Sequence, residues 1–296
     1  MEDFDLFGNP IIKDVILREQ FIEPPFSVLD TKTGNWQRRK KLWHSLGIKS
    51  EVGRDVKVHT MPTNKYDLTN MEETYYSDTA QKLNTSIFDP ALCEVLYKWF
   101  CCDGGAILDP FAGGSVRGIV AHYLGYKYTG IDIRQEQIES NVEQAISILA
   151  EDNQPTWIVG DSNEVLSDIK GEDYDLVFSC PPYADLEVYS DLEGDISNMN
   201  YPEFLTAYES IIERSCKLLK PNKYACFVVG EVRDKKGNYI GFVPDTIRAF
   251  EKCGMKFYNE AILLNPVVSA SMRASNNMKS QKLVKIHQNV LVFKKH

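Results

Sequence analysis

The sequence lacks the features of membrane proteins and of disulfide-rich secreted proteins. No apolar run approaches the roughly 18 residues that a transmembrane helix needs. The seven cysteines are odd in number and form no Cys-x-x-Cys pair, which favours a reduced, cytosolic chain without a disulfide framework or a zinc cluster. The acidic segment Met1–Asp5 has neither the basic nor the apolar region of a secretory signal. We therefore expect a globular, cytoplasmic protein with no membrane partner and no metal site.

Two long segments lack acidic residues altogether, although acids dominate the chain. The 296 residues hold 33 Lys and Arg against 42 Asp and Glu, and the net charge of −9 argues by itself against a nucleic-acid partner. Residues 36–50 nevertheless carry five basic residues, residues 261–296 carry six, and the remaining 245 residues sum to −20. Nucleic acid can therefore approach at two places, although a solvated helix face explains the run Arg38–Lys41 equally well.

From residue 87 onward, short apolar runs alternate with amphipathic helices. Residues 87–100 have helical apolar spacing after Ser86, a candidate N-cap residue. This alternation predicts an α/β fold in which a mostly parallel sheet has helices on both faces. Residues 265–289 show no clear period, and so long a connection is usually functional or disordered. Seven strands are expected, at residues 106–108, 128–133, 157–159, 175–179, 224–230, 257–264 and 290–293.

The first part of the chain does not follow this alternation. It holds Pro24-Pro25, the basic run with Trp36 and Trp43, and a polar stretch at residues 60–85. We interpret residues 1–85 as a small N-terminal accessory region or arm, and residues 86–296 as one α/β domain.

A glycine-rich turn joins the first expected strand to the following helix, in residues 109–118, DPFAGGSVRG. Small residues at this place let a ligand approach the backbone, and a helix N-terminus offers N–H groups to it. Asp132 ends the second strand nineteen residues after Gly113, where a carboxylate accepts hydrogen bonds from ribose hydroxyls. An ordinary tight turn and the cofactor site of an NAD-dependent dehydrogenase fit this pattern as well.

A second motif, residues 179–183 with the sequence SCPPY, follows the fourth expected strand. Two consecutive prolines remove two backbone donors and leave their carbonyls unengaged. Such a loop can stack a planar heterocycle on Tyr183 and direct carbonyl oxygens at an exocyclic amine of that ring. A rigid strand exit with an incidental tyrosine is the alternative.

Together the two motifs resemble those of the S-adenosylmethionine-dependent DNA amino-methyltransferases. Residues 109–118 are similar to motif I, Asp-Pro-Phe-x-Gly-x-Gly, and residues 180–183 to motif IV, (Asp/Asn/Ser)-Pro-Pro-Tyr. Residues 20–50 are similar to the leader of methylase-like proteins of phages and mobile elements. The resemblance implies a Rossmann-like class I methyltransferase domain over residues 86–296. It implies transfer of a methyl group from S-adenosylmethionine to cytosine N4 or adenine N6 of a base flipped out of double-stranded DNA.

The resemblance also assigns candidate site residues. Those implied to bind the cofactor are Asp109, Phe111, Ala112, Gly113, Gly114, Ser115, Asp132, Ile133, Asp161 and Ser162. Those implied to act on the target base are Ser179, Cys180, Pro181, Pro182 and Tyr183. In-line positioning, stacking on Tyr183 and hydrogen bonds to the amine would supply most of the catalysis, since methyl transfer here needs no strong base.

The sequence departs from the family pattern at two positions. Ser115 takes the place of the second glycine of motif I, with Gly114 one position early. Cys180 takes the Asp/Asn/Ser position of motif IV, where a thiol is a weaker hydrogen-bond acceptor than a carboxylate or an amide. Because cysteine is nearly isosteric with serine, this departure favours cytosine N4 over adenine N6. The adjacent Ser179 should point to the opposite side of the strand.

The segments expected to contact DNA are the two basic ones. Trp36 and Trp43 fit a DNA contact and core packing equally well. The acidic residues between 185 and 195 are better explained as a solvated loop than as a lid over the cofactor. The basic side chains expected to contact DNA are Arg38, Arg39, Lys40 and Lys41 in the first segment, and Arg273, Lys279, Lys282 and Lys285 in the second.

Two other functions remain open at this stage. One is methylation of RNA or of a glutamine amide in a protein, and the other is nucleic-acid binding without catalysis. The sequence leaves the oligomeric state open, a homodimer included, as well as a role in a restriction–modification system.

Overall fold

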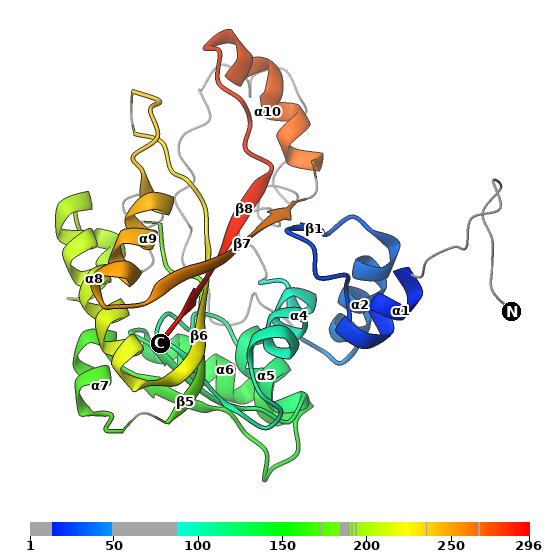
Figure 1. Ribbon diagram of the computed structural model, residues 1–296, viewed down its shortest axis with the longest axis vertical. Coiled ribbons are helices and arrows are strands. Elements are labelled where there is room, and N and C mark those ends of the chain that lie inside the picture. The colour runs from blue at the N-terminus through cyan, green and yellow to red at the C-terminus, as the bar shows by residue number, and fades with distance from the viewer. Residues whose placement is uncertain are drawn as a thin grey trace, which may run out of the picture.

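A mixed sheet, formed by eight strands of the part of the chain that the structure describes, lies at the centre of the molecule (Figure 1). The computed structural model describes residues 14–48, 88–171, 173–183, 190, 192, 194–234, 236–265 and 267–296. The strands are β1 (Val28–Asp30), β2 (Ala106–Asp109), β3 (Lys127–Asp132), β4 (Thr156–Val159), β5 (Tyr174–Ser179), β6 (Leu219–Val229), β7 (Lys256–Leu264) and β8 (His287–Lys294). The helices are α1 (Asp14–Phe21), α2 (Gly34–Ser45), α4 (Pro90–Phe100), α5 (Val116–Tyr123), α6 (Gln135–Ile148), α7 (Ser162–Asp168), α8 (Tyr201–Leu218), α9 (Phe242–Lys252), α10 (Val268–Lys279) and the short 3₁₀ helix η2 (Ile196–Asn198).

The sheet has the strand order β1-β7-β8-β6-β5-β2-β3-β4. Strands β2 to β6 are mutually parallel, and the chain reverses its direction of travel across the sheet between β2 and β5. In open α/β sheets, ligands bind beyond the carboxyl ends of the strands at such a reversal. The Rossmann-like α/β fold predicted from the sequence is confirmed.

The sheet contains one strand more than the seven expected from the sequence. Strand β1, from the N-terminal region, pairs in parallel with β7, with Val28 opposite Ile262. Strand β8 lies between β6 and β7 and is antiparallel to both. Strand β1 has no signal in the sequence because three residues are too few to show an alternating pattern. Part of the N-terminal region therefore extends the main sheet.

Helices cover both faces of the sheet, and two apolar cores result. One core joins α2, α4, α5 and α6 to the sheet, and the other joins α7, α8 and α9 to its opposite face. Figure 1 shows α8 and α9 on one side of the strands and α4 and α5 on the other. Buried aromatic rings, such as Phe204, Tyr208 and Phe250 in the second core, give each layer a large apolar area.

Two helices differ from the sequence expectation. Helix α4 begins at Pro90 because Asp89 caps it, and its carboxylate accepts the N–H of Ala91 at 3.0 Å. The expected cap, Ser86, lies outside the described residues. Helix α10 lies in the connection whose sequence showed no clear period. The helical period is missing because most of the helix's side chains are exposed, so apolar residues do not recur at core spacing. None of the helices described is both long and apolar enough to cross a bilayer.

Candidate active site

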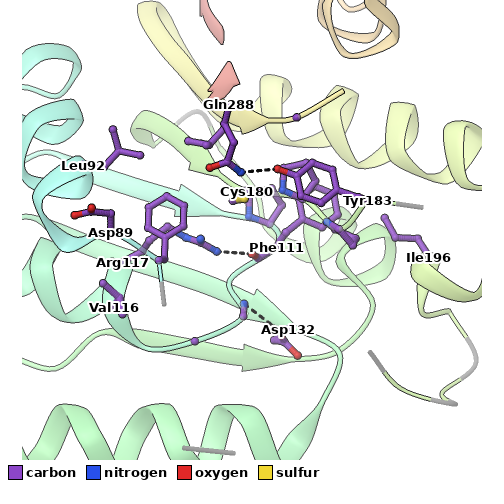
Figure 2. Close-up of a pocket in the computed structure, with 18 of the residues that line it drawn as sticks. Asp89, Leu92, Phe111, Val116, Arg117, Asp132, Cys180, Tyr183, Ile196 and Gln288 are labelled. Carbon is purple, nitrogen blue, oxygen red and sulfur yellow. Dashed lines mark hydrogen bonds between the residues drawn. The ribbon is translucent and has the colours of Figure 1, made fainter. Parts of the chain in front are cut away.

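A cavity of about 740 Å³ opens at the carboxyl edge of the sheet. Its walls come from the ends of β2, β3, β4, β5 and β6, from the two ends of the connection between β7 and β8, and from α2 and α4. Figure 2 shows Asp89, Val116 and Arg117 toward one end, Tyr183 and Ile196 toward the other, and Asp132 below. The glycine-rich turn and the SCPPY motif, far apart in the sequence, therefore share one cavity.

Asp109 organises the glycine-rich turn from beneath the cavity. Its carboxylate is fully buried and accepts hydrogen bonds from Ser179 Oγ at 2.5 Å, Tyr128 Oη at 2.6 Å and Arg117 Nε at 2.5 Å. It also accepts the N–H of Phe111 at 3.2 Å. The four donors compensate for burial of the charge and fix β2, β3, β5 and the turn relative to one another. Asp109 does not line the cavity, so its place in the structure is that of a support.

Arg117 is a site residue to which the sequence analysis assigned no role. Its guanidinium donates to the carbonyls of Phe111 and Ala112 at 2.6 and 2.8 Å and lies over the Phe88 ring, 4.6 Å from its centroid. Desolvation by burial opposes its charge, but the ion pair with Asp109 outweighs this and raises the pKa of Arg117. The guanidinium thus holds the turn open around the cavity. The available signal in the sequence was an arginine eight residues after the aspartate that ends the strand.

The turn places backbone N–H groups and a carboxylate at the cavity. Gly113 has φ of +51°, a conformation that favours glycine, and donates its N–H to Asp132 Oδ2 at 3.0 Å. Asp132 Oδ1 accepts the N–H of Arg134 at 2.9 Å. Burial raises the pKa of the Asp132 carboxyl, against the lowering effect of these N–H donors. Each carboxylate oxygen keeps a lone pair for a ligand, since a carboxylate has about four acceptor sites.

The first departure from motif I has a structural explanation. The Ser115 side chain is buried and donates from Oγ to Gln144 Oε1 at 2.7 Å, tying the turn to α6. Gly114 faces open space, because a Cβ placed there would meet no atom within 4 Å. The glycine at position 114 therefore leaves room at the cavity, while Ser115 anchors the start of α5.

The loop after β4 forms the next part of the wall. Asp161 caps α7 by accepting the N–H of Asn163 at 2.8 Å, and Ser162 Oγ donates to the Pro110 carbonyl at 2.5 Å. Both residues line the cavity together with Ile133. Asp195, the described residue of the acidic stretch, also lines the cavity and caps η2; Asp185, Glu187, Asp191 and Glu193 lie outside the described residues.

Tyr183 lies in the half of the cavity opposite Asp89, which we call the far half (Figure 2). Residues that the sequence did not indicate hold it there. Its hydroxyl accepts a hydrogen bond from Gln288 Nε2 at 2.8 Å, as Figure 2 shows. Its ring meets Phe242 edge to face, with centroids 5.9 Å apart and planes at 80°. Cys180, Pro181 and Pro182 line the same half, whereas Ser179 is buried on Asp109. The tyrosine ring is therefore oriented before any ligand binds.

The candidate cofactor residues divide by position. Asp109, Ala112 and Ser115 do not line the cavity and support the turn from below. Seven others line it: Phe111, Gly113, Gly114, Asp132, Ile133, Asp161 and Ser162. Carboxylates at the ends of β3 and β4 beside an open glycine backbone suit the hydroxyls and polar ring atoms of a nucleoside. This part of the cavity thus fits a nucleoside-containing cofactor.

Comparison with known proteins gives a match to a family model over part of the chain. Residues 23–143 match the family model described as DNA methylase. The match confirms the family resemblance predicted from the motifs. It covers α2, the glycine-rich turn and Asp132, and it ends before the SCPPY motif. No curated protein matches the sequence.

Solved structures with a similar arrangement include several that are described as methyltransferases. TrmN from Thermus thermophilus is 12% identical with a TM-score of 0.48, over 75% of this chain and 53% of that one. A TehB-like SAM-dependent methyltransferase from Corynebacterium glutamicum is 16% identical with a TM-score of 0.43, over 76% and 100%. A putative DNA modification methylase, also from T. thermophilus, is 20% identical with a TM-score of 0.35, over 46% and 50%. This chain spans about half the length of the first and third proteins, and its fold assignment rests on its own strand order.

The first basic segment packs against the body of the protein. Trp36 and Trp43 are buried in the core, which settles the alternative that the sequence left open. Arg39 donates to Glu94 at 2.7 Å, and Lys40 pairs with Asp89 at 3.3 Å and lines the cavity. Arg38 and Lys41 lie on the outer side of α2, where both are exposed; residues 49 and 50 lie outside the described residues.

The second basic segment projects from the sheet. Helix α10 extends beyond the ends of β7 and β8 (Figure 1), with Arg273 and Lys279 exposed on it. Lys282 follows the helix and lies against Gly237 of the turn between β6 and α9. Lys285 reaches back to line the cavity. The four basic residues expected to contact DNA thus run from the cavity to the tip of this projection.

Proposed function

We propose that the protein transfers a methyl group from S-adenosylmethionine to the exocyclic amine of a base flipped out of double-stranded DNA. The target is cytosine N4 or adenine N6. The observation that carries the proposal is the shared cavity, which joins a nucleoside-binding turn to a Pro-Pro-Tyr loop. The DNA methylase match over residues 23–143 supports a DNA substrate.

The near half of the cavity, which contains the glycine-rich turn, Asp132 and Asp161, suits the cofactor. Asp132 would accept hydrogen bonds from the ribose hydroxyls, and Asp161 would contact the adenine ring beside Ile133. Phe111, held by Arg117 through its carbonyl, would pack against the cofactor from the floor of the turn. The bound cofactor supplies an electrophilic methyl group on a sulfonium.

The far half of the cavity suits the target base. Tyr183, fixed by Gln288 and Phe242, offers its ring as a stacking surface, which contributes about 1–3 kcal/mol per base. The carbonyl of Pro181 and the side chain of Cys180 would receive hydrogen bonds from the exocyclic amine and direct its lone pair at the methyl group. Transfer of the methyl group would exchange a C–S bond of the cofactor for a C–N bond on the base, and the methylated amine would release a proton to solvent. Positioning of this kind can contribute roughly 7–11 kcal/mol.

DNA would approach from the side of α10. Besides the basic residues of that projection, the neighbouring turn carries Arg233 and Lys236, which the sequence analysis overlooked. Arg233 lies over the exposed Tyr239 ring at 3.9 Å and donates to the Gly237 carbonyl at 2.6 Å. Gly237 contacts Lys282, so the turn between β6 and α9 and the α10 projection form one basic surface beside the cavity. Such a surface would make phosphate contacts around a flipped nucleotide.

Incubation with radiolabelled S-adenosylmethionine and duplex DNA, followed by mass spectrometry of the nucleosides, tests this proposal. N4-methylcytosine or N6-methyladenine is the expected product. If label appears only in RNA or in protein, the substrate is not DNA and the proposal is wrong. Absence of transfer together with absence of cofactor binding would also overturn the proposal.

Tyr183→Ala should lower turnover at least about 100-fold while cofactor affinity changes less than about twofold, because the stacking surface is lost but the near half is intact. Tyr183→Phe keeps the ring and loses the bond to Gln288, so it should retain most of the activity. Tyr258→Ala, at an exposed tyrosine outside the cavity, is the matched control. Equal activity of Tyr183→Ala and the control would refute the stacking role.

A further inference from the structure

A side-chain ion pair lies in the cavity wall at the end away from Tyr183. Lys40 Nζ is 3.3 Å from Asp89 Oδ2, and both residues line the cavity. The Lys40 side chain is 31% exposed and that of Asp89 13% exposed, so both remain open to the cavity while largely shielded from bulk water. Figure 2 places Asp89 beside Val116, across the cavity from Tyr183.

Neighbouring groups fix this pair in place. Asp89 Oδ2 also accepts the indole N–H of the buried Trp36 at 3.0 Å, and Oδ1 accepts the N–H of Ala91 at 3.0 Å. Helix α2, which carries Lys40, is anchored by the bond from Gln37 Nε2 to the Thr31 carbonyl at 2.6 Å. A preorganised charge pair loses little conformational entropy when it binds a ligand.

The other basic side chains of the cavity either bind protein groups or lie in the other half of the cavity. Four Lys and Arg side chains line the cavity among the described residues, namely Lys40, Arg117, Arg134 and Lys285. Arg117 is bound to Asp109 and to two turn carbonyls, and Arg134 is buried and donates to Gln137 at 2.5 Å. Lys285 belongs to the wall that also carries Gln288 and therefore lies with the target-base half. Of these four cations, Lys40 is placed at the opposite end, next to the glycine-rich turn.

We propose that Lys40 and Asp89 bind the amino-acid end of S-adenosylmethionine. The inference rests on the proposed function and deepens it. The amino-acid end of this cofactor is a zwitterion, with a carboxylate and an ammonium on one carbon, and adjacent Lys and Asp side chains present the complementary charges. Charge-assisted hydrogen bonds of this kind are about twice as strong as neutral ones. With the nucleoside at Asp132 and the methyl group directed at Tyr183, the amino-acid end extends toward α4 and α2.

Helix α2 is then a wall of the cofactor site, and Lys40 acts there and not on DNA. The N-terminal region brings Lys40 to the cavity through two anchors, the pairing of β1 with β7 and the packing of Trp36 against α4.

Calorimetric titration of three ligands in the absence of DNA tests the inference. The ligands are S-adenosylmethionine, its decarboxylated form, and 5′-methylthioadenosine, which lacks the amino-acid end. Lys40→Gln should weaken binding of S-adenosylmethionine about tenfold and leave binding of the other two within about twofold. Lys41→Gln, at the exposed neighbouring position outside the cavity, is the matched control and should change none of the three.

Asp89→Asn tests the second half of the pair without removing the helix cap. Asparagine caps helices as well as aspartate does, so the helix start should be retained, but its single acceptor oxygen cannot also receive the Trp36 N–H, and a thermal melt measures the cost of that lost bond. This variant should weaken binding of S-adenosylmethionine and of its decarboxylated form, which both carry the ammonium, and leave 5′-methylthioadenosine unaffected.

The outcomes separate this inference from the proposed function. Equal losses for all three ligands would show a purely structural role, and unchanged affinities would show that the pair does not touch the cofactor; either result overturns the inference alone. If the unaltered protein binds neither S-adenosylmethionine nor 5′-methylthioadenosine, the proposed function fails and the inference fails with it.

Discussion

The two acid-free basic segments of this chain have opposite surroundings. In α2, the tryptophans at positions 36 and 43 are buried, and Arg39 and Lys40 pair with carboxylates at α4. In α10, the side chains are mostly exposed, apolar ones included, with Met272 70% exposed. The same charge pattern therefore serves internal ion pairs in one segment and an open surface in the other.

The difference follows from what accompanies the charges. Two tryptophans seven residues apart lie on one face of α2, and burying them brings the adjacent basic residues to Glu94 and Asp89. Helix α10 has no comparable apolar face, so its cations stay at the surface of the part of the chain that the structure describes. In this chain, the basic segment without buried tryptophans is therefore the one whose cations stay exposed.

The largest expected contrast concerns stability. Trp36→Ala should lower the free energy of unfolding by about 3–5 kcal/mol, because it removes a fully buried indole and its bond to Asp89. Met272→Ala on α10 should change it by less than about 0.5 kcal/mol. Chemical denaturation of both variants measures the contrast, and equal effects would show that α2 is no more part of the core than α10.

The next contrast concerns DNA. Replacing Arg273, Lys279 and Lys282 together by Gln should weaken duplex binding roughly 10- to 100-fold at low salt and reduce the salt slope by up to about 3, one unit per phosphate contact. The double variant Arg38→Gln with Lys41→Gln, which removes the outer charges of α2, should cost less than about threefold. Fluorescence anisotropy at several salt concentrations distinguishes the two. A larger loss in the α2 variant would reverse the assignment of the DNA-facing side.

A smaller effect should separate neighbours within α2. Arg39→Gln breaks a partly buried bond to Glu94, and we expect it to lower the free energy of unfolding by about 1 kcal/mol. Arg38→Gln removes only an exposed bond to Asn35, so its effect should be within about 0.3 kcal/mol. Thermal melts of the two variants provide the measurement, and a greater loss for Arg38→Gln would contradict the packing described for α2.

The smallest effect should be a dependence on pH found only in the second segment. Burial lowers the pKa of Lys285, against the opposing effect of Glu231. Lys285 therefore loses its proton at a lower pH than an ordinary lysine, whose pKa is near 10.4. As pH rises toward about 10, DNA affinity should fall by roughly threefold as this one contact is lost. Lys285→Arg keeps the charge and should abolish the fall; an identical fall in that variant would assign it to other groups.

The sequence predicted the centre of the fold and both motifs of the site. The βα alternation after residue 87 indicated the sheet with helices on both faces, because each element had to bury its own apolar side. The residues of the glycine-rich turn and of the SCPPY loop were found because strand ends, glycines and prolines leave local signals. Gln288, Phe242 and Arg117 were missed as site residues, since nothing local marks a glutamine or a phenylalanine that meets Tyr183 from another strand or helix.

By itself the sequence determined the kind of fold and the place of the two motifs, because these depend on periodicity and on residue types at short spacing. Only the tertiary structure decided which of the two basic segments keeps its cations exposed, that β1 extends the sheet, and that Lys40 lines the cavity. Those outcomes depend on contacts between residues dozens to hundreds of positions apart, such as Trp36 with Asp89 and Val28 with Ile262, and no local pattern records such contacts.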